Sequence, residues 1–324
     1  MNALPCESIQ RDVIVKKESI TDPSMGFDIG RRPVETLIYY GIINIDKPKG
    51  PTSHQVSDYV QKILDIDKAG HAGTLDPAVT GVLPIALCRA TRIVQALLPA
   101  GKEYVCIMHL HKDAGERKIK KVFRQFTGKI RQTPPIKSAV RRKEREREVY
   151  YLDIMERDSR DILFKVGCEA GTYIRKLVHD MGAKLGTGAH MASLRRTKAA
   201  CFGESSLFTL QDLADAYYYW KEDNNEAFIR KIVQPMESAL SHLSKIWVND
   251  SAVEALCHGR PLAVPGISKL HNNINPEDAV ALMTLKNELI AIADSAMTSL
   301  CMLKSRRGIA AQPKKVFMKE HTYA

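Results

Sequence analysis

Hydrophobic and polar positions alternate from about residue 37 onward in a way that predicts both strands and helices. The run GIINIDK predicts a buried strand that Pro48 ends, and Thr52 or Ser53 then offers an N-cap for a helix. Residues on one face of that helix are apolar, namely Val56, Val60, Ile63 and Leu64. The run VLPIAL at residues 82–87 predicts a second buried strand.

The middle of the chain repeats this combination. The segment KEYVCIMHLH alternates as a strand and places four residues on one face: Tyr104, Cys106, Met108 and Leu110. Helical spacing follows at Ile119, Val122, Phe123 and Phe126. The segments VYYLDIME and DILFKVGCEA predict paired strands, and a helix after AGTY turns five apolar residues inward: Ile174, Leu177, Val178, Met181 and Leu185.

The two ends of the chain differ from this central region. Residues 1–36 are polar and lack periodicity, so we expect an arm that contact with the folded body partly orders. Beyond about residue 240, short apolar runs such as AVALMTL and LIAIADS alternate with turns. The pattern predicts an α+β protein with a large domain and a small β-rich domain, divided near residue 240.

One segment favours neither helix nor strand. In GHAGTLDPAVTG, glycines permit unusual backbone angles, Pro77 biases Asp76 toward an extended conformation, and two threonines can bond the backbone locally. A rigid loop that presents the Asp76 carboxylate is one interpretation. An ordinary Asp-Pro turn that caps the next segment is the other.

Charge and cysteine usage narrow the class of protein. The chain carries 48 Lys and Arg against 37 Asp and Glu, a formal net charge of +11, which favours a polyanionic partner such as RNA or DNA. Seven cysteines occur without any CxxC pair, which indicates a reduced, intracellular setting. No run approaches the ~18 to 20 apolar residues of a spanning helix, so we expect a soluble protein that does not enter a membrane.

Several candidate chemistries are weak or open. The octet RRKERERE at residues 141–148 is either a solvated face or a mobile arm that grips phosphate. His109 and His111 share a strand face, but His71, His179 and His190 show no ligand spacing relative to them, so we expect no metal site. The chain has no GxxxxGK[ST] and no GxSxG. Residues Tyr104, Tyr173 and Arg175 could converge on Asp76, or serve as ordinary sheet and surface residues.

Three long motifs identify a family. GHAGTLDPAVTGVLPIALCRATRI, KEYVCIMHLH and CEAGTYIRKLVHDMGAKLGTGAHMASLRRT resemble the TruB-type RNA pseudouridine synthases. RPVETLIYYGIINIDKPKGPTSHQV and the tail RGIAAQPKKVFMKEHTYA are similar to the archaeal dyskerin-like catalytic subunits of box H/ACA ribonucleoproteins. The resemblance spans residues ~30 to 320. Cys88 stands where the family pattern has glycine, which puts the local backbone geometry in doubt.

The resemblance implies a fold and a domain order. It implies a catalytic domain with a mixed, mainly antiparallel sheet flanked by helices, followed by a small β-rich PUA domain. The implied ranges are an N-terminal arm at 1–36, the catalytic domain at 37–240 with a thumb loop at about 131–149, and the PUA domain at 245–318.

The resemblance also implies roles for individual residues. Asp76 would be catalytic, Arg175 would pair with it, and Leu194 would form an apolar wall of the base pocket. Tyr104 would stack on the target base and Tyr173 would lie over the reacting nucleotide. The expected RNA-phosphate contacts of the thumb are Arg141, Arg142, Lys143, Arg145 and Arg147. Arg260, in the turn HGRPLAVPG, would meet RNA in the PUA domain or be an ordinary loop arginine.

The implied reaction is the isomerisation of uridine to pseudouridine in rRNA directed by a box H/ACA guide RNA, with the T-loop of tRNA as a further substrate. One ionised carboxylate suffices, as nucleophile at C1′ or base at C2′, and no cofactor or metal is needed. The implied partners are small proteins of the Nop and Gar type and a kink-turn-binding ribosomal-type protein. We expect the protein to be cytoplasmic. A non-catalytic RNA-binding scaffold is the alternative that the charge allows.

Overall fold

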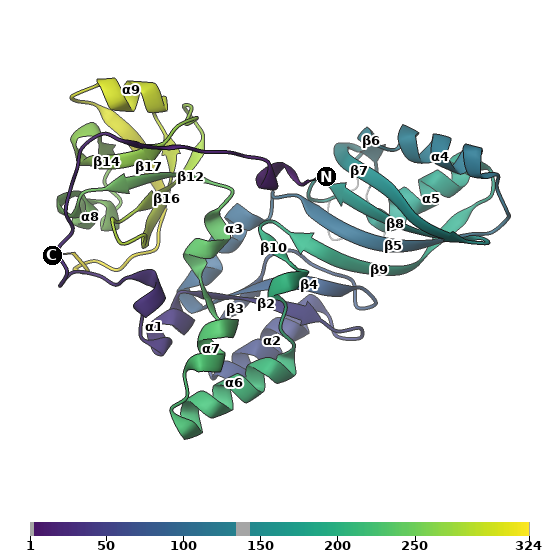
Figure 1. Ribbon diagram of the computed structural model, residues 1–324, viewed down its shortest axis with the longest axis horizontal. Helices are drawn as coiled ribbons and strands as arrows, with labels where there is room; N and C mark the ends of the chain where they lie inside the picture. Colours follow the sequence, from purple (N-terminus) through teal and green to yellow (C-terminus); the bar gives the residue numbers. More distant parts are fainter. Residues whose placement is uncertain (1–2, 134–142, 324) are drawn as a thin grey trace. The chain divides into compact units, whose positions relative to one another are not determined.

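The computed structural model describes residues 3–133 and 143–323, and the chain divides into two compact units. The first unit comprises Met1–Ser8, Ile43–Ile85 and Val94–Tyr218, and the second comprises Ile9–Ile42, Ala86–Ile93 and Tyr219–Ala324. Each unit has its own sheet and its own apolar core (Figure 1).

The first unit is built on a mixed, mainly antiparallel sheet. Its main order is β2-β4-β9-β5-β8-β7-β6, with β10 beside β9 and β3 beside β4. Of the pairings among these strands, β4 with β9 is parallel, whereas β9, β5, β8, β7 and β6 pair in antiparallel succession. The strands are β2 (Gly41–Lys47), β3 (Ala69–His71), β4 (Thr80–Leu87), β5 (Lys102–Leu110), β6 (Gly128–Gln132), β7 (Arg145–Asp158), β8 (Asp161–Cys168), β9 (Ala189–Ala199) and β10 (Phe202–Gly203).

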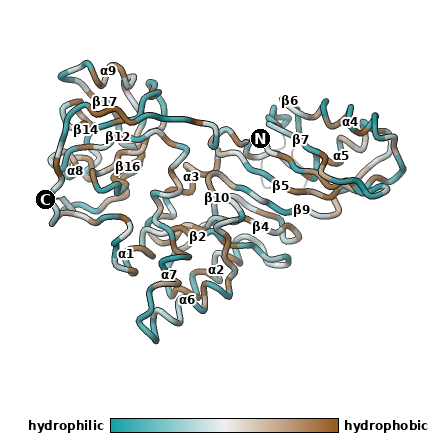
Figure 2. Tube along the Cα trace, viewed as in Figure 1, coloured by the Kyte–Doolittle hydropathy of each residue, from teal (hydrophilic) through white to brown (hydrophobic). Residues whose placement is uncertain are grey.

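The helices of the first unit are α2 (Ser53–Leu64), α3 (Val94–Leu97), α4 (Glu116–Gln125), α5 (Ile174–Leu185) and α6 (Leu210–Asp223), the last of which ends in the second unit. Of these, α2, α4 and α5 pack an apolar face against strands of the sheet. Helices α4 and α5 lie side by side against the antiparallel strands (Figure 1). Apolar and polar residues alternate along both helices, because one face meets the core and the other meets solvent (Figure 2).

The elements expected from the hydrophobic pattern are confirmed. Strand β5 buries the predicted face, and α5 buries all five residues expected to point inward. Helix α2 begins after Thr52, whose side chain accepts a hydrogen bond from the Gln55 backbone in a capping box. Its Ile63 is only partly buried, unlike its other apolar residues.

The second unit is a small β-rich body. Its sheet has the order β1-β14-β12-β15-β16-β17-β13. The strands are β1 (Val13–Val15), β12 (Ser244–Val248), β13 (Leu262–Ala263), β14 (Ile267–His271), β15 (Ala279–Met283), β16 (Leu289–Ser295) and β17 (Ile309–Val316), and β11 (Gln234–Pro235) pairs with the start of β2. The helices are α1 (Val34–Tyr39), α7 (Ala227–Ile232), α8 (Asp250–Cys257) and α9 (Ser299–Lys304).

Residues 9–42 are an integral part of the second unit. Strand β1 adds to the edge of the sheet, where Val13 faces His271 in an antiparallel pairing with β14. The Lys16 ammonium donates to three backbone carbonyls at the end of α9, those of Met302, Leu303 and Ser305, over 2.6 to 3.0 Å. The polar N-terminal segment has no hydrophobic core of its own, and these hydrogen bonds hold it in place.

Cys88 adopts a left-handed backbone conformation, with φ of 39°. A side chain is disfavoured there, whereas glycine tolerates it, which agrees with the glycine of the family pattern at this position. The departure therefore stores a small local strain after β4.

In the described parts of the chain, no helix is both long enough and apolar enough to cross a membrane. All seven cysteines carry free thiols.

Candidate active site

The loop that carries Asp76 joins β3 to β4, and buried side chains form hydrogen bonds with its backbone. The fully buried Lys47 ammonium donates to the carbonyls of Pro48, Pro77 and Val79 over 2.9, 3.2 and 2.9 Å. The buried Ser53 hydroxyl accepts from the Leu75 backbone N–H at 2.8 Å and donates to its carbonyl at 3.2 Å. Asp76 is thus presented by a loop with little freedom, as the first interpretation of this segment expects.

Two further buried cations lie under the same loop. Arg196 is 1% exposed and donates to the carbonyls of Val82 and Gly73 at 2.7 and 3.1 Å. Lys102 is buried too, and desolvation together with Arg196 lowers its pKa to about 8. Desolvation also lowers the pKa of Lys47, and the nearby Asp76 carboxylate offsets part of that effect. The loop backbone therefore lies over concentrated positive charge.

Asp76 forms an ion pair with Arg175. The Arg175 Nη2 donates to Asp76 Oδ2, although 99 residues separate the two in the chain. Their side chains are 55% and 54% exposed, so both groups are open to a ligand from solvent. Arg175 lies in the first turn of α5, a rigid helix whose inner face is buried in the core.

The start of α5 is fixed by Gln132, the last residue of β6. The buried Gln132 side-chain amide donates to the Tyr173 carbonyl at 3.2 Å and accepts from the Tyr173 N–H at 3.0 Å. Tyr173 is the N-cap of α5 and its side chain is partly exposed. Gln132 therefore connects the strand that leads into residues 133–143 with the turn that carries Tyr173 and Arg175.

Tyr104 and Leu194 lie together in the apolar core beside this site. Both are 9% exposed, and they share a cluster with Leu75 and Val79 of the Asp76 loop. Burial raises the pKa of Tyr104, and the adjacent Arg196 guanidinium offsets part of the rise. The expected aromatic and apolar residues thus border the loop from the sheet side.

Of the expected phosphate-binding residues in the thumb, Arg141 and Arg142 lie outside the described residues. Lys143 and Arg145 are exposed, whereas Arg147 is partly buried and pairs with Glu169 at 3.3 Å. The ends of segment 131–149 are strands, because β6 and β7 pair from Gly128 opposite Val149 to Gln132 opposite Arg145. Arg260 follows α8 in the second unit and is exposed.

The histidines are closer together than their spacing indicates. His111 Nε2 lies 3.1 Å from His190 Nδ1, and His109 lies opposite His190 across β5 and β9. His109 Nδ1 is 2.7 Å from Asp161 Oδ1. Among the residues that the structure describes, no group of three such side chains has the geometry to hold a metal ion.

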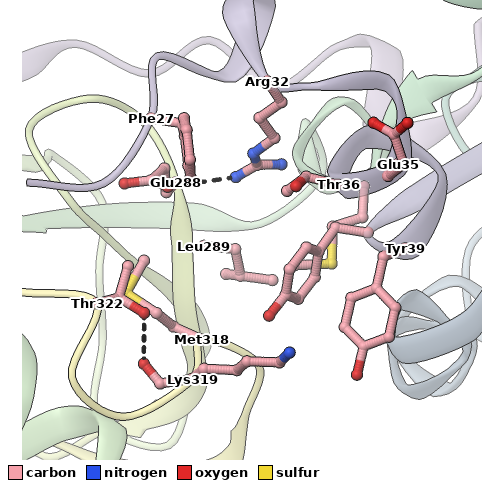
Figure 3. Close-up of a pocket in the computed structure, with 12 residues that line it drawn as sticks. Phe27, Arg32, Glu35, Thr36, Tyr39, Glu288, Leu289, Met318, Lys319 and Thr322 are labelled. Carbon is pink, nitrogen blue, oxygen red and sulfur yellow. Dashed lines mark hydrogen bonds and ion pairs between the residues drawn. The ribbon is translucent and has the colours of Figure 1, made fainter.

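A separate pocket of about 400 Å³ lies wholly within the second unit (Figure 3). Its buried charged groups have partners: Arg32 binds Glu237 with two bonds of 2.8 and 3.0 Å and lies 3.8 Å from Glu288. The Lys319 ammonium lies 4.9 Å from the centre of the Tyr39 ring. The pocket joins α1 and residues 318–322 to the start of β16, and we assign it a structural role.

His71 gives the Asp76 loop a predicted acid sensitivity. Both ring nitrogens are buried and have no hydrogen-bond partner among the described residues, and desolvation, His54 and Arg196 lower the pKa of His71 to about 4. Because this lies below the unfolded value near 6.5, the folded protein binds fewer protons, and stability falls as pH decreases from about 6.5 to 4. We expect the first unit to lose on the order of 1 to 3 kcal/mol over that range, since a half-buried imidazolium keeps part of its hydration.

The change His71→Phe should remove this part of the acid sensitivity. The measurement is the unfolding temperature at pH 7 and at pH 4.5, with His179→Phe as an exposed control. His271 in the second unit also has its pKa lowered to about 4, so the acid sensitivity of that unit should persist. An equal loss in His71→Phe and the control would contradict a titrating His71.

The residues gathered here can perform one kind of chemistry. They combine an accessible carboxylate, an arginine that pairs with it, a rigid supporting loop and an adjacent apolar and aromatic wall. The sequence does not mark Lys47, Ser53, Gln132 or Arg196 as supports of this site. Lys47, Ser53 and Arg196 lie within quoted motifs, Ser53 also being a possible N-cap, and Gln132 lies only within the range 131–149.

Family models cover nearly the whole chain. They are described as the DKCLD (NUC011) domain, the N-terminal domain of TruB family pseudouridylate synthase, the tRNA pseudouridylate synthase B C-terminal domain and the PUA domain, and they match residues 3–57, 61–174, 175–241 and 244–317 in turn.

Individual relatives match over more than nine tenths of their own length. A probable tRNA pseudouridine synthase B of Pyrococcus furiosus is 55% identical over 99% of this chain and 94% of its own length. Its namesake in Methanopyrus kandleri is 52% identical over 97% of this chain and 93% of its own.

Two solved structures have the same fold throughout. A chain in the crystal structure of a Cbf5-Nop10-Gar1 complex superposes with a TM-score of 0.94 at 55% identity, covering 99% of this chain and 98% of that one. A chain from an H/ACA ribonucleoprotein bound to a substrate RNA containing 2′-deoxyuridine gives a TM-score of 0.94 at 52% identity, covering 99% of both chains.

Proposed function

The chain belongs to the TruB family of pseudouridine synthases, and from this premise we propose that it isomerises uridine in RNA as the catalytic subunit of an H/ACA-type ribonucleoprotein. Its substrate is then a uridine of rRNA positioned by a guide RNA, and the T-loop of tRNA is a second substrate. The cytoplasm, where these RNAs function, is its place of action, which agrees with the seven free thiols.

One observation carries the proposal. A chain taken from an H/ACA particle with substrate RNA superposes on this one over 99% of both lengths. The likeness therefore extends beyond the Asp76 loop to both units. The names of the curated relatives refer to tRNA, and they support the second substrate.

The chemistry assigns a role to each residue of the candidate site. Isomerisation breaks the bond between N1 and the ribose, turns the uracil and rejoins it through C5, while a proton leaves C5 and one is gained at N1. The Asp76 carboxylate acts as nucleophile at C1′ or as base at C2′, and Arg175 forms an ion pair with it. The target nucleotide must first leave its stack, and Tyr104, Tyr173 and Leu194 supply the aromatic and apolar surfaces that receive it.

The proposed assembly divides recognition among several molecules. Base pairing with the guide RNA selects the uridine, and small proteins of the Nop10 and Gar1 type complete the particle, as in the complex that resembles this chain. The exposed Lys143, Arg145 and Arg260 are candidates for phosphate contacts. Arg147 contributes less, because Glu169 already neutralises it.

The test measures pseudouridine formation in two substrates. Purified protein is incubated with an rRNA fragment plus matching guide RNA, with and without the two small proteins, and separately with a tRNA transcript. Guide-dependent modification of the rRNA fragment supports the H/ACA assignment, and a mismatched guide is the control. If the protein modified the tRNA transcript but not the rRNA fragment, the H/ACA assignment would be wrong and the protein would be a stand-alone tRNA enzyme.

Gln132 provides a prediction on the positioning of Tyr173 and Arg175. In Gln132→Glu, a protonated carboxyl can reproduce both bonds to Tyr173, whereas an ionised one repels the Tyr173 carbonyl. Because burial raises the pKa of such a carboxyl above its usual ~4.3, we expect the kcat of this variant, relative to the unchanged protein at the same pH, to fall as pH rises.

The control for this prediction is Gln132→Leu, which lacks both bonds and should be impaired at every pH. Affinity for RNA should change little in either variant, because Gln132 is buried. A constant ratio of kcat across the pH range for Gln132→Glu would show that the amide does not position the site.

A further inference from the structure

The outer face of α4 is strongly basic and open to solvent. Its inner face buries Ile119, Val122 and Phe123 in the core. On the outer face, an open hollow of about 440 Å³ is lined by Arg117, Lys120, Lys121, Arg124 and Gln125. We call the four cations of this set the α4 basic face.

The α4 basic face is not neutralised by neighbouring acids. Lys120 pairs with Glu116 at 2.5 Å. Within the described residues, no ion pair or hydrogen bond links Arg117, Lys121 or Arg124 to an acid. In the neighbouring hairpin of β6 and β7, facing acids pair with Lys129 at 3.0 Å and with Arg131 at 4.0 Å, whereas Arg145 is exposed. On α4, Arg117, Lys121 and Arg124 leave a surplus of positive charge.

We propose that the α4 basic face binds backbone phosphates of RNA that flank the target uridine, as a contact surface separate from segment 131–149. Residues three and four apart on a helix lie about 5 to 6 Å from one another, so these four cations form one continuous patch. The patch offers cations and a single amide but no aromatic ring, which suits contact with the sugar-phosphate backbone independent of base sequence.

The position of α4 connects this surface with the candidate site. The helix packs against α5, which carries Arg175, and it continues through Thr127 into β6, which ends at Gln132. All of these elements belong to the first unit. RNA held on the α4 basic face is thus held by the same rigid body that presents Asp76. The inference rests on the proposed function for the identity of its partner.

The test compares two double variants with the same loss of charge. Lys121→Gln with Arg124→Gln alters the α4 basic face, and Lys62→Gln with Lys68→Gln alters exposed lysines at the end of α2 and just beyond it. Affinity for a long substrate RNA is measured by fluorescence anisotropy across a salt series. We expect the α4 variant to bind about tenfold or more weakly at low salt, with a salt slope shallower by about 0.7 to 0.9 for each lost contact, and the control to show neither change.

Two further readouts make the outcome decisive. With a short RNA that contains only the target loop, the difference between the two variants should vanish, because the flanking phosphates are missing. Equal affinities and slopes for the two variants on the long RNA would overturn the inference, as would failure of the unchanged protein to bind RNA. The anisotropy experiment measures RNA binding and does not depend on pseudouridine formation. If the unchanged protein bound RNA but formed no pseudouridine, the proposed function would be refuted, and the comparison of the two variants would still test the α4 basic face.

Discussion

Asp76→Asn should abolish pseudouridine formation, with a rate on the order of 10⁴-fold or more below that of the unchanged protein. The amide keeps the shape of the side chain but has no negative charge for attack at C1′ or proton removal at C2′. Stability should change by less than about 1 kcal/mol, because the ion pair with Arg175 is roughly half exposed on both sides. RNA binding should persist or strengthen, since one negative charge is lost beside a polyanion.

The measurement is single-turnover pseudouridine formation at saturating RNA, together with the unfolding temperature and the RNA affinity of the same preparations. Asp58→Asn is a matched control, because Asp58 is an exposed carboxylate on the outer face of α2. Turnover by Asp76→Asn at a rate near that of the control would refute the catalytic role of Asp76. If the unchanged protein bound RNA and made no product, the non-catalytic scaffold would be the better description.

Lys47→Met should destabilise the first unit by about 2 to 4 kcal/mol and reduce catalysis with it. Methionine fills similar space, but the carbonyls of Pro48 and Val79 lose the ammonium that they bond at 2.9 Å. The Pro77 carbonyl keeps the Gly50 N–H at 2.9 Å, so the loss is incomplete. Burying the Lys47 charge costs desolvation free energy in the unchanged protein. The variant does not have this cost, which limits the expected destabilisation.

Hydrogen exchange distinguishes loosening of the Asp76 loop from general unfolding. The amides of Leu75 and Val79, bonded to Ser53 and to the Asp76 carbonyl, should exchange faster in Lys47→Met, while amides in β5 and β8 should change less. Lys62→Met, at an exposed position on α2, is the control and should stay within about 0.5 kcal/mol of the unchanged protein. Unaltered exchange at Leu75 and Val79 would mean that Lys47 does not support the loop.

The elements around the candidate site could be predicted because they depend on neighbouring residues. Strand β5 follows from the alternation of side chains along KEYVCIMHLH, α5 from helical spacing, and the start of α2 from the capping residue Thr52. The irregular loop around Asp76 follows from its glycines, threonines and Pro77 for the same reason. The family, and with it the class of reaction, was recognisable from three motifs, and the comparisons confirm it.

Other features depend on residues far apart in the chain. The pairing of Asp76 with Arg175 joins a loop and a helix that 99 residues separate, and spacing carries no information on such a meeting. The approach of His190 to His111 likewise arises only from the pairing of β5 with β9. The membership of residues 9–42 in the second unit depends on an edge strand whose partner, β14, comes some 250 residues later in the chain.

By itself, the sequence determined the order of strands and helices, the irregular Asp76 loop and the family. Only the tertiary structure decided which polar residues support that loop. From the sequence alone, a lysine at the end of a strand and a glutamine in a polar segment would ordinarily be assigned to solvent. Lys47 and Gln132 are buried here because backbone groups that are distant in the chain, those of Pro77, Val79 and Tyr173, converge on them when the chain folds and form hydrogen bonds with their side chains.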